Sequence, residues 1–220
     1  MDVICNSCSY SMNHLQSDLW ICDHCGLISS TIPPDHTQYD KSYVIKYRRY
    51  ERSKDGQAIQ QLRADMVRRN TFGVNTVLDF GCGVGSFIKE IAKDGNFIAR
   101  GYDINPFGGF NNVEILFQPW DVATFWDSLE HMERPRDLIV GLKPKYIFAC
   151  APCLDDWKGE ITDWKHYYPG EHLHYFTEAS FRKLLEYSGY EVVEVNFYES
   201  KHRRGGGEKN IISIGGRKRG

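Results

Sequence analysis

The glycine-rich segment at residues 76–88, TVLDFGCGVGSFI, most constrains the fold of this chain. The apolar Val77 and Leu78 predict a buried strand, and the following SFIKEIAKDG predicts a helix. Glycines at alternate positions between them allow a sharp turn and a close approach of the backbone to a ligand: Gly81, Gly83 and Gly85. The spacing is not the G-x-G-x-x-G of dinucleotide-binding proteins. The segment therefore predicts a Rossmann-like nucleotide-binding core.

Acidic residues accompany the first two predicted strands. Asp79 directly precedes the glycine-rich turn, and a second strand over 97–103 ends in Asp103. A carboxylate at the end of that second strand is placed to bind both hydroxyls of a ribose. The pattern therefore indicates a ligand with a nucleoside portion.

These motifs, in this order, resemble the class I S-adenosylmethionine (SAM)-dependent methyltransferases. VLDFGCGVG is similar to their motif I and GYDINP to their motif II, while residues 121–135 resemble the fourth strand and its loop. Residues 171–185 resemble the segment before the penultimate helix in the branch of ubiquinone-type O-methyltransferases and bacterial sugar methyltransferases. The resemblance implies an α/β fold with a mostly parallel seven-stranded Rossmann-like sheet and an antiparallel last strand. An unrelated Rossmann-like domain is the alternative.

The resemblance also implies a set of cofactor contacts. Gly81, Gly83 and Gly85 would hold the methionine end of SAM, with Asp79 on its ammonium side and Asp103 on the ribose. The other implied contacts lie after the second strand and at the end of the fourth: Ile104, Phe125, Trp126 and Asp127.

The sequence departs from the family pattern between Asp103 and Asp121, where a helix, a third strand and a loop are usual. This segment is short and contains Pro106, so we predict that the second helix is lost but the sheet is retained. The helix near 134–142 also looks short. Further strands are predicted over 146–149, 190–198 and 210–214, the last two forming an antiparallel hairpin across the 201–209 loop.

Two Cys-x-x-Cys pairs, thirteen residues apart, lie near the N-terminus: Cys5, Cys8, Cys22 and Cys25. Two such pairs predict a structural zinc site of four thiolates. A redox dithiol needs only one pair, disulfides need an oxidising compartment, and a catalytic zinc keeps one position open. These pairs, followed by Pro33-Pro34 and a Tyr-Asp-x-x-Tyr segment, resemble zinc-ribbon methyltransferases of carbohydrate and polysaccharide pathways.

The expected organisation is a zinc ribbon over 1–30, a linker with an aromatic segment over 31–54, and a methyltransferase domain over 55–220. Within the linker, four tyrosines recur at helical spacing: Tyr39, Tyr43, Tyr47 and Tyr50. This stripe is either a packing face or an aromatic cover over a pocket. An amphipathic helix is predicted over 55–70.

Methyl transfer from a sulfonium requires alignment of the acceptor and removal of its proton. We expect His172 to be the base, because the adjacent Glu171 would raise the pKa of the imidazole and orient the ring. Tyr168 lies upstream, and His174 would share the face of His172 if this segment were a strand. A structural role for His172 in a pocket wall is the alternative.

A second candidate centre is formed by Asp127, Glu130 and His131. Asp-x-x-Glu-His resembles the metal-binding cluster proposed for ubiquinone-type O-methyltransferases, and such a site would suit Mg²⁺. His131 is also a candidate catalytic residue. The alternative is an acid at a helix start beside a packed histidine.

The partner predicted by these features is a small-molecule or glycan acceptor. The net charge of −2 and the pI of about 6.4 disfavour a nucleic-acid substrate, and residues 126–129 read WDSL instead of a Pro-Pro-Tyr-like tetrapeptide. A nucleic-acid methyltransferase stays open through the ribbon and a basic C-terminal group: Lys201, Arg203, Arg204, Lys209, Arg217, Lys218 and Arg219. A module that binds SAM without catalysis is a third possibility.

The remaining cysteines and the location of the chain complete the expectations. Cys150 and Cys153 form a third Cys-x-x-Cys without a partner pair, and we expect buried thiols there. The N-terminus lacks a secretory signal and the sequence lacks a long apolar run, so a cytoplasmic protein is expected.

Overall fold

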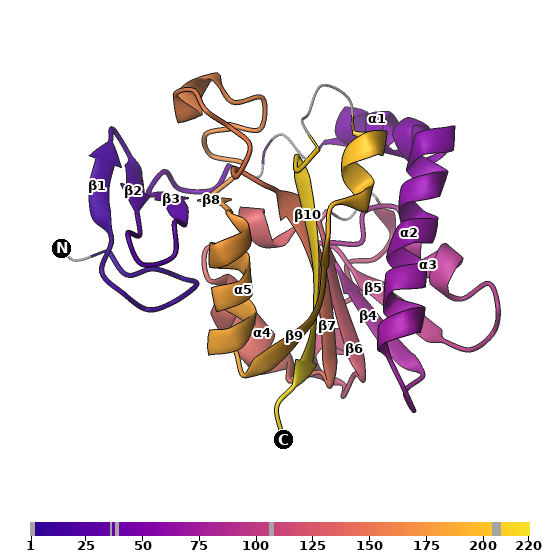
Figure 1. Ribbon diagram of the computed structural model, residues 1–220. Helices are drawn as coiled ribbons and strands as arrows, with labels where there is room; N and C mark the ends of the chain where they lie inside the picture. The colour runs from indigo at the N-terminus through magenta and orange to yellow at the C-terminus, as the bar shows by residue number, and fades with distance from the viewer. Residues whose placement is uncertain (1–2, 36, 38–39, 106–107, 204–207) are drawn as a thin grey trace.

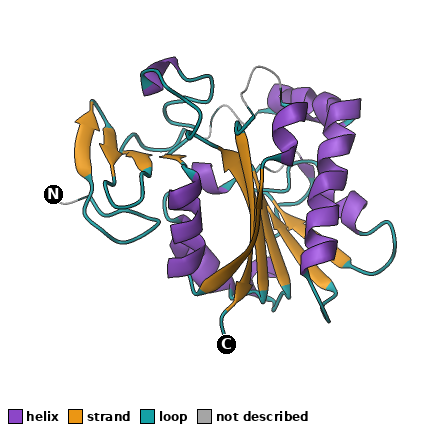
Figure 2. Ribbon diagram, in the orientation of Figure 1, coloured by secondary structure: helices purple, strands orange, loops and turns teal. Residues whose placement is uncertain are grey.

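The computed structural model describes residues 3–35, 37, 40–105, 108–203 and 208–220. Its centre is a six-stranded sheet with helices on both faces, and a small all-β unit at the N-terminus lies beside it (Figures 1 and 2). The sheet order is β5-β4-β6-β7-β10-β9. The strands span Thr76–Phe80 (β4), Ile98–Tyr102 (β5), Val122–Trp126 (β6), Tyr146–Pro152 (β7), Tyr190–Asn196 (β9) and Ile211–Lys218 (β10).

Strands β5, β4, β6 and β7 are parallel, and β10 runs antiparallel to both of its neighbours, β7 and β9. The predicted mostly parallel sheet with an antiparallel last strand is therefore confirmed. Parallel strands are buried on both faces, which explains why β6 and β7 are almost continuously apolar.

Helices cover the two faces of the sheet in pairs (Figure 1). Helices α2 (Lys54–Asn70) and α3 (Ser86–Ile91) pack on one face, and α4 (Pro135–Leu142) and α5 (Glu178–Tyr187) pack on the other. Ser53 caps α2 by accepting a hydrogen bond from the backbone N–H of Gly56. The predicted amphipathic helix over 55–70 is confirmed as α2.

The sheet has six strands instead of the expected seven. Between β5 and β6 the described residues form one short 3-10 helix, η2 (Val113–Phe117), where the family pattern places a helix and a strand. The segment is short, and its described residues form neither a third strand nor a second α-helix. Pro106, on which the prediction of a lost helix rested, lies outside the described residues.

The N-terminal unit consists of β1 (Asn13–Gln16), β2 (Leu19–Ile21) and β3 (Ile28–Ser30). Its sheet gains a fourth strand, β8 (His174–Tyr175), which comes from a distant part of the chain. Ile28 pairs with Tyr175 in an antiparallel register. The ribbon therefore shares a sheet with the segment that precedes α5.

Helix α1 (Lys41–Glu51) forms within the predicted linker. Asp40 caps it by accepting a hydrogen bond from the backbone N–H of Tyr43, and the rings of Tyr43 and Tyr47 stack at 4.3 Å. Tyr39, the first member of the predicted stripe, lies outside the described residues. Among the described residues, no helix has the length and apolar character needed to cross a bilayer.

Candidate active site

A cavity of about 820 Å³ lies at the carboxyl ends of β4, β5 and β6, and α1 forms part of its wall. This is the edge of an α/β sheet at which ligands bind. The cavity brings together residues from the predicted cofactor and catalytic sets, including Asp79, Gly81, Gly83, Asp103, Ile104 and His172.

The glycine-rich turn requires glycine for conformation and for space. Gly81, Gly83 and Gly85 have φ angles of 78°, 54° and 75°. A Cβ on Gly81 would lie 2.7 Å from the Cβ of Ser128, and one on Gly85 would lie 2.5 Å from the Phe110 ring. Gly81 and Gly83 line the cavity, whereas Gly85 leads the chain into α3. The backbone of the turn is thus open to a ligand.

Asp103 is held by two backbone N–H groups. Its Oδ2 accepts a hydrogen bond from Gly83 at 2.7 Å, and its Oδ1 accepts one from Asn105 at 2.8 Å. Burial outweighs these hydrogen bonds and raises the pKa of the carboxyl. Asp103 therefore lines the cavity in a fixed orientation beside the glycine-rich turn.

Asp79 lies at the end of β4 and is only 2% exposed. Its Oδ1 accepts a hydrogen bond from the Thr124 hydroxyl at 2.7 Å. Burial raises the pKa of Asp79 to about 7, so that a bound cation would favour its ionised form near neutral pH.

The three residues predicted at the end of the fourth strand do not share one environment. Trp126 and Asp127 line the cavity, but Phe125 does not; its ring is fully buried and packs against Phe80 at 5.7 Å. Successive side chains of a strand point to opposite faces, so Trp126 faces α2 and α3 while Phe125 faces the core beneath α4 and α5. The prediction that Phe125 lines the pocket was wrong.

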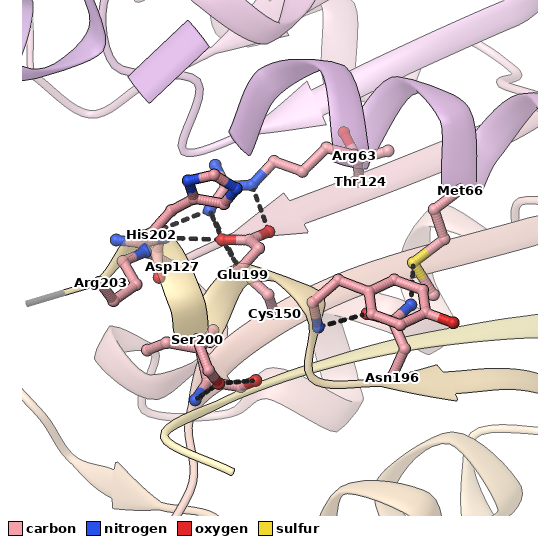
Figure 3. Close-up of polar contacts among 12 residues, drawn as sticks. Arg63, Met66, Thr124, Asp127, Cys150, Asn196, Glu199, Ser200, His202 and Arg203 are labelled. Carbon is pink, nitrogen blue, oxygen red and sulfur yellow. Dashed lines mark hydrogen bonds and ion pairs between the residues drawn. The ribbon is translucent and has the colours of Figure 1, made fainter. Parts of the chain in front are cut away.

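Asp127 belongs to a buried ion-pair network that the sequence analysis missed (Figure 3). Its Oδ2 accepts from Arg63 at 2.7 Å and from Arg203 at 2.6 Å, and both arginines also bind Glu199. Burial opposes the charge of Asp127, but the two guanidinium groups outweigh it and lower the carboxyl pKa. The Arg63 guanidinium also lies 5.1 Å from the Trp126 ring centre. Asp127 is therefore an anion that is paired with two arginines.

His131 and His172 both line the cavity, and their rings meet in an edge-to-face arrangement. Their ring centres lie 4.7 Å apart. The Nδ1 of His131 hydrogen-bonds the backbone oxygen of Glu171 at 2.8 Å, and that of His172 hydrogen-bonds the backbone oxygen of His166 at 2.8 Å. A carbonyl only accepts, so both rings carry their proton on Nδ1, and in the neutral rings Nε2 is the basic nitrogen.

The electrostatics of His172 differ from the prediction. Burial, together with the nearby His131, lowers the pKa of His172 to about 3, so the ring is neutral at physiological pH. Glu171 does not raise the pKa of His172; its backbone oxygen orients His131 instead. The carboxyl of Glu171 lines the cavity, where burial raises its pKa, and the Tyr168 ring meets the edge of His172 at 5.2 Å.

His174 does not share the face of His172. It lies in β8 and hydrogen-bonds Ser29 of the ribbon at 2.9 Å, and it does not line the cavity. His172 precedes this two-residue strand, so the alternation expected along a strand does not extend to it.

The predicted cluster of Asp127, Glu130 and His131 is not formed in the described part of the chain. The group of possible ligands that is gathered there consists of Glu130, His131 and His172, whose donor atoms lie within 4.8 Å of one another. Asp127 belongs instead with the arginines. Two imidazoles and one carboxylate are a poor match to the oxygen ligands of Mg²⁺, so the expectation of Mg²⁺ loses its structural basis.

The four N-terminal cysteines converge on one point. Their Sγ atoms are 3.6 Å apart for Cys5 and Cys25, 3.4 Å for Cys8 and Cys22, and 3.5 Å for Cys8 and Cys25. Sulfurs at about 2.3 Å from a tetrahedral zinc lie about 3.8 Å apart, whereas bonded disulfide sulfurs lie about 2.0 Å apart. The four thiols thus fit a tetrahedral metal ion. Cys150 and Cys153 are buried free thiols, as predicted.

The comparisons with known proteins agree with this geometry. Residues 47–195 match the sequence model of a family described as a methyltransferase domain, so the chain belongs to that family. Comparison with curated protein sequences gives no match.

Several solved structures share the fold at low sequence identity. Magnesium protoporphyrin IX methyltransferase from Synechocystis PCC 6803, solved with bound SAH, is 19% identical with a TM-score of 0.56, covering 82% of this chain and 96% of that one. A SAM-dependent methyltransferase from Archaeoglobus fulgidus is 20% identical with a TM-score of 0.56, covering 81% and 100%. One from Clostridium acetobutylicum ATCC 824 is 12% identical with a TM-score of 0.57, covering 82% and 100%. The chain therefore belongs to a methyltransferase-domain family and shares its fold with solved SAM-dependent methyltransferases.

Proposed function

We propose that this enzyme transfers the methyl group of SAM to a hydroxyl group or a carbon of a small polar acceptor, such as a carbohydrate or a phenol. The observation that supports this most directly is the pair of imidazoles, His131 and His172, in the same cavity as the glycine-rich turn. In this proposal the glycine-rich turn binds the nucleoside portion of SAM, and the two histidines orient the acceptor and accept its proton.

The geometry of the turn supports a set of cofactor contacts. Asp103 would bind the ribose hydroxyls, Gly81 and Gly83 the methionine portion, and Asp79 would lie on the ammonium side, with Ile104 and Trp126 adding apolar surface. When bound, SAM supplies an electrophilic methyl group on a positively charged sulfur.

The two histidines have different roles: His172 orients the acceptor and His131 accepts its proton. His172 stays neutral, so its Nε2 accepts a hydrogen bond from an acceptor hydroxyl and orients the oxygen toward the methyl group. His131 takes the proton at Nε2 as the new carbon–oxygen bond forms. Burial raises the pKa of Glu130, whose Oε1 lies 3.9 Å from that nitrogen; the imidazolium would favour the ionised carboxylate and be stabilised by it.

Aromatic side chains on α1 support a ring-shaped acceptor. Tyr43 and Tyr47 stack on each other and line the cavity, and Tyr168 lines it next to His172. Aromatic faces pack well against sugar rings and against planar phenols while their hydroxyls provide hydrogen bonds. This favours the aromatic-cover interpretation of the tyrosine stripe.

A nucleic-acid substrate has less support. Arg203 is bound to Asp127 and Glu199, and Arg217 pairs with Glu191 at 3.0 Å, so neither is available as a phosphate contact without breaking an ion pair. Arg204 lies outside the described residues.

The proposal includes a metal site formed by the four N-terminal cysteines. We assign Cys5, Cys8, Cys22 and Cys25 to one structural Zn²⁺, because four convergent thiols close a tetrahedral shell and leave no position for a substrate. The hydrogen bond from Cys25 lowers the pKa of Cys5 to about 5, which favours a thiolate there. Metal analysis of the purified protein should give one zinc per chain, and a value near zero would contradict the assignment.

The roles of the histidines can be separated from cofactor binding. His131→Ala and His172→Ala should each bind SAM with the wild-type Kd while turnover falls by about 10²-fold or more. His14→Ala, a substitution in the ribbon strand β1, serves as the control and should leave turnover unchanged. Wild-type turnover in both active-site variants would refute the proposed proton transfer.

A further inference from the structure

Helix α1 presents one face to the cavity. Tyr43, Tyr47 and Glu51 are spaced four residues apart, which places them along one side of the helix, and all three line the cavity. Helix α1 contains no fully buried residue. It therefore covers the site without being part of the hydrophobic core.

Glu51 is the last residue of this helix and lies against the glycine-rich turn. Its Oε2 accepts a hydrogen bond from the hydroxyl of Ser86, the first residue of α3, at 2.6 Å. A Cβ built on Gly83 would lie 4.0 Å from its Oε1. Since Asp103 binds the backbone N–H of the same glycine, the two carboxylates flank Gly83.

Partial burial disfavours the ionised form of Glu51, and this effect outweighs the opposing charges of Arg63, Lys89 and Arg48. Burial raises the pKa of its carboxyl, and the hydrogen bond from Ser86 comes from a neutral group. Two cations of the cavity wall, Arg63 and Arg203, form ion pairs with Asp127 and Glu199. A partly buried carboxylate in this position would be stabilised by a cationic ligand that enters the cavity.

We propose that Glu51 is a cofactor-binding residue whose carboxylate accepts a hydrogen bond from the ammonium group of the methionine portion of SAM. This inference rests on the SAM-binding site described above and adds a contact from α1, outside the sequence motifs. Because Tyr43 and Tyr47 lie on the same helix, the contact links cofactor binding to the wall proposed to hold the acceptor.

Ligands that differ in the amino acid portion test this contact. SAM and S-adenosylhomocysteine carry the ammonium group, and 5′-methylthioadenosine lacks it. In calorimetric titration, Glu51→Gln should raise the Kd of the first two by about 10-fold or more, as expected for loss of a charge-assisted hydrogen bond, and leave that of 5′-methylthioadenosine unchanged. Glu114→Gln, the same change in η2, should behave like the wild type.

Two results of the titration would overturn the proposal. An unchanged Kd for SAM in Glu51→Gln would show that the carboxylate makes no contact. An equal weakening of 5′-methylthioadenosine would show that Glu51 only shapes the turn. Neither result affects the methyltransferase assignment, whereas failure of the wild-type protein to bind SAM would remove the cofactor site and this contact together.

Hydrogen exchange provides a second readout that does not depend on turnover. SAM should slow amide exchange over residues 41–51 in the wild-type protein, because the ligand anchors the end of α1. The same addition to Glu51→Gln should protect α1 much less. Equal protection in both proteins would contradict the anchoring role.

Discussion

The buried ion-pair network beneath the cavity makes a quantitative prediction for Arg63→Met. Arg63 is 6% exposed and donates through Nε and Nη2 to Glu199 at 2.7 and 2.8 Å and to Asp127 at 2.7 Å. Methionine keeps much of the aliphatic volume but removes the charge, which leaves the buried Glu199 and the partly exposed Asp127 with Arg203 as their guanidinium partner. Removal of one partner of a buried ion pair costs about 3–5 kcal/mol. We expect a loss of this size in the free energy of unfolding.

Arg69→Met is the matched control, because Arg69 lies on the same helix and also pairs with a glutamate, Glu194. The Arg69 side chain is 42% exposed, and pairs of this kind contribute about 0–1 kcal/mol. Urea denaturation of zinc-loaded protein at pH 7 compares the two variants. A cost for Arg63→Met no larger than that for Arg69→Met would refute the reasoning.

The comparison is made at pH 7 because the pKa of the Asp127 carboxyl is lowered in the folded protein. The charges of Arg203 and Arg63 hold the pKa of Asp127 below its usual value, so ionised Asp127 stabilises the fold. A depressed folded-state pKa gives stability that is complete above the unfolded value of about 3.9 and is lost as the pH falls below it. The difference between wild type and Arg63→Met should therefore be full at pH 7 and shrink in strong acid.

Three further predictions concern the cofactor and the metal. Asp103→Ala should abolish SAM binding in calorimetric titration because the ribose loses its fixed acceptor, and a wild-type Kd would remove that assignment. The Kd of SAM should decrease as the pH rises from 6 to 8, because ionisation of Asp79, with its pKa of about 7, strengthens attraction to the ammonium group; Asp79→Asn should flatten this dependence. Cys22→Ser should lower the zinc content and the thermal midpoint together, since metal binding contributes to folding, and retention of one zinc per chain would contradict the four-thiolate site.

Local patterns in the sequence predicted which residues gather around the glycine-rich turn. Asp79 lies two residues before the glycine-rich turn, and Asp103 directly follows the next strand, so two adjacent parallel strands bring them together. The antiparallel β10 was predictable for a similar reason, because its hairpin partner β9 is adjacent in sequence.

The ion-pair network could not be predicted in this way. Arg63 and Glu199 are 136 residues apart, and neither belongs to a recognisable motif. Their contact depends on the packing of α2 over the sheet and on the turn after β9. Asp127 was singled out correctly as a residue of the cavity wall, but its arginine partners decide what it can bind.

The pairing of the N-terminal unit with β8 could not be predicted from the sequence either. The two Cys-x-x-Cys pairs predicted the convergence of four thiols, yet not that β3 would pair with His174–Tyr175. This pairing takes His174 away from the cavity and leaves His172 facing His131. The segment between β5 and β6 is short, and its described residues form a 3-10 helix instead of the expected third strand.

Methyl-labelled SAM incubated with the purified protein and a host extract gives the most direct test of the proposed function. Asp103→Ala serves as the inactive control, and the labelled products are fractionated by size and nuclease sensitivity. We predict label in small polar metabolites or glycans, present with the wild-type protein and absent with the control. Label confined to nuclease-sensitive polymer would contradict a small polar acceptor and make a nucleic acid the substrate.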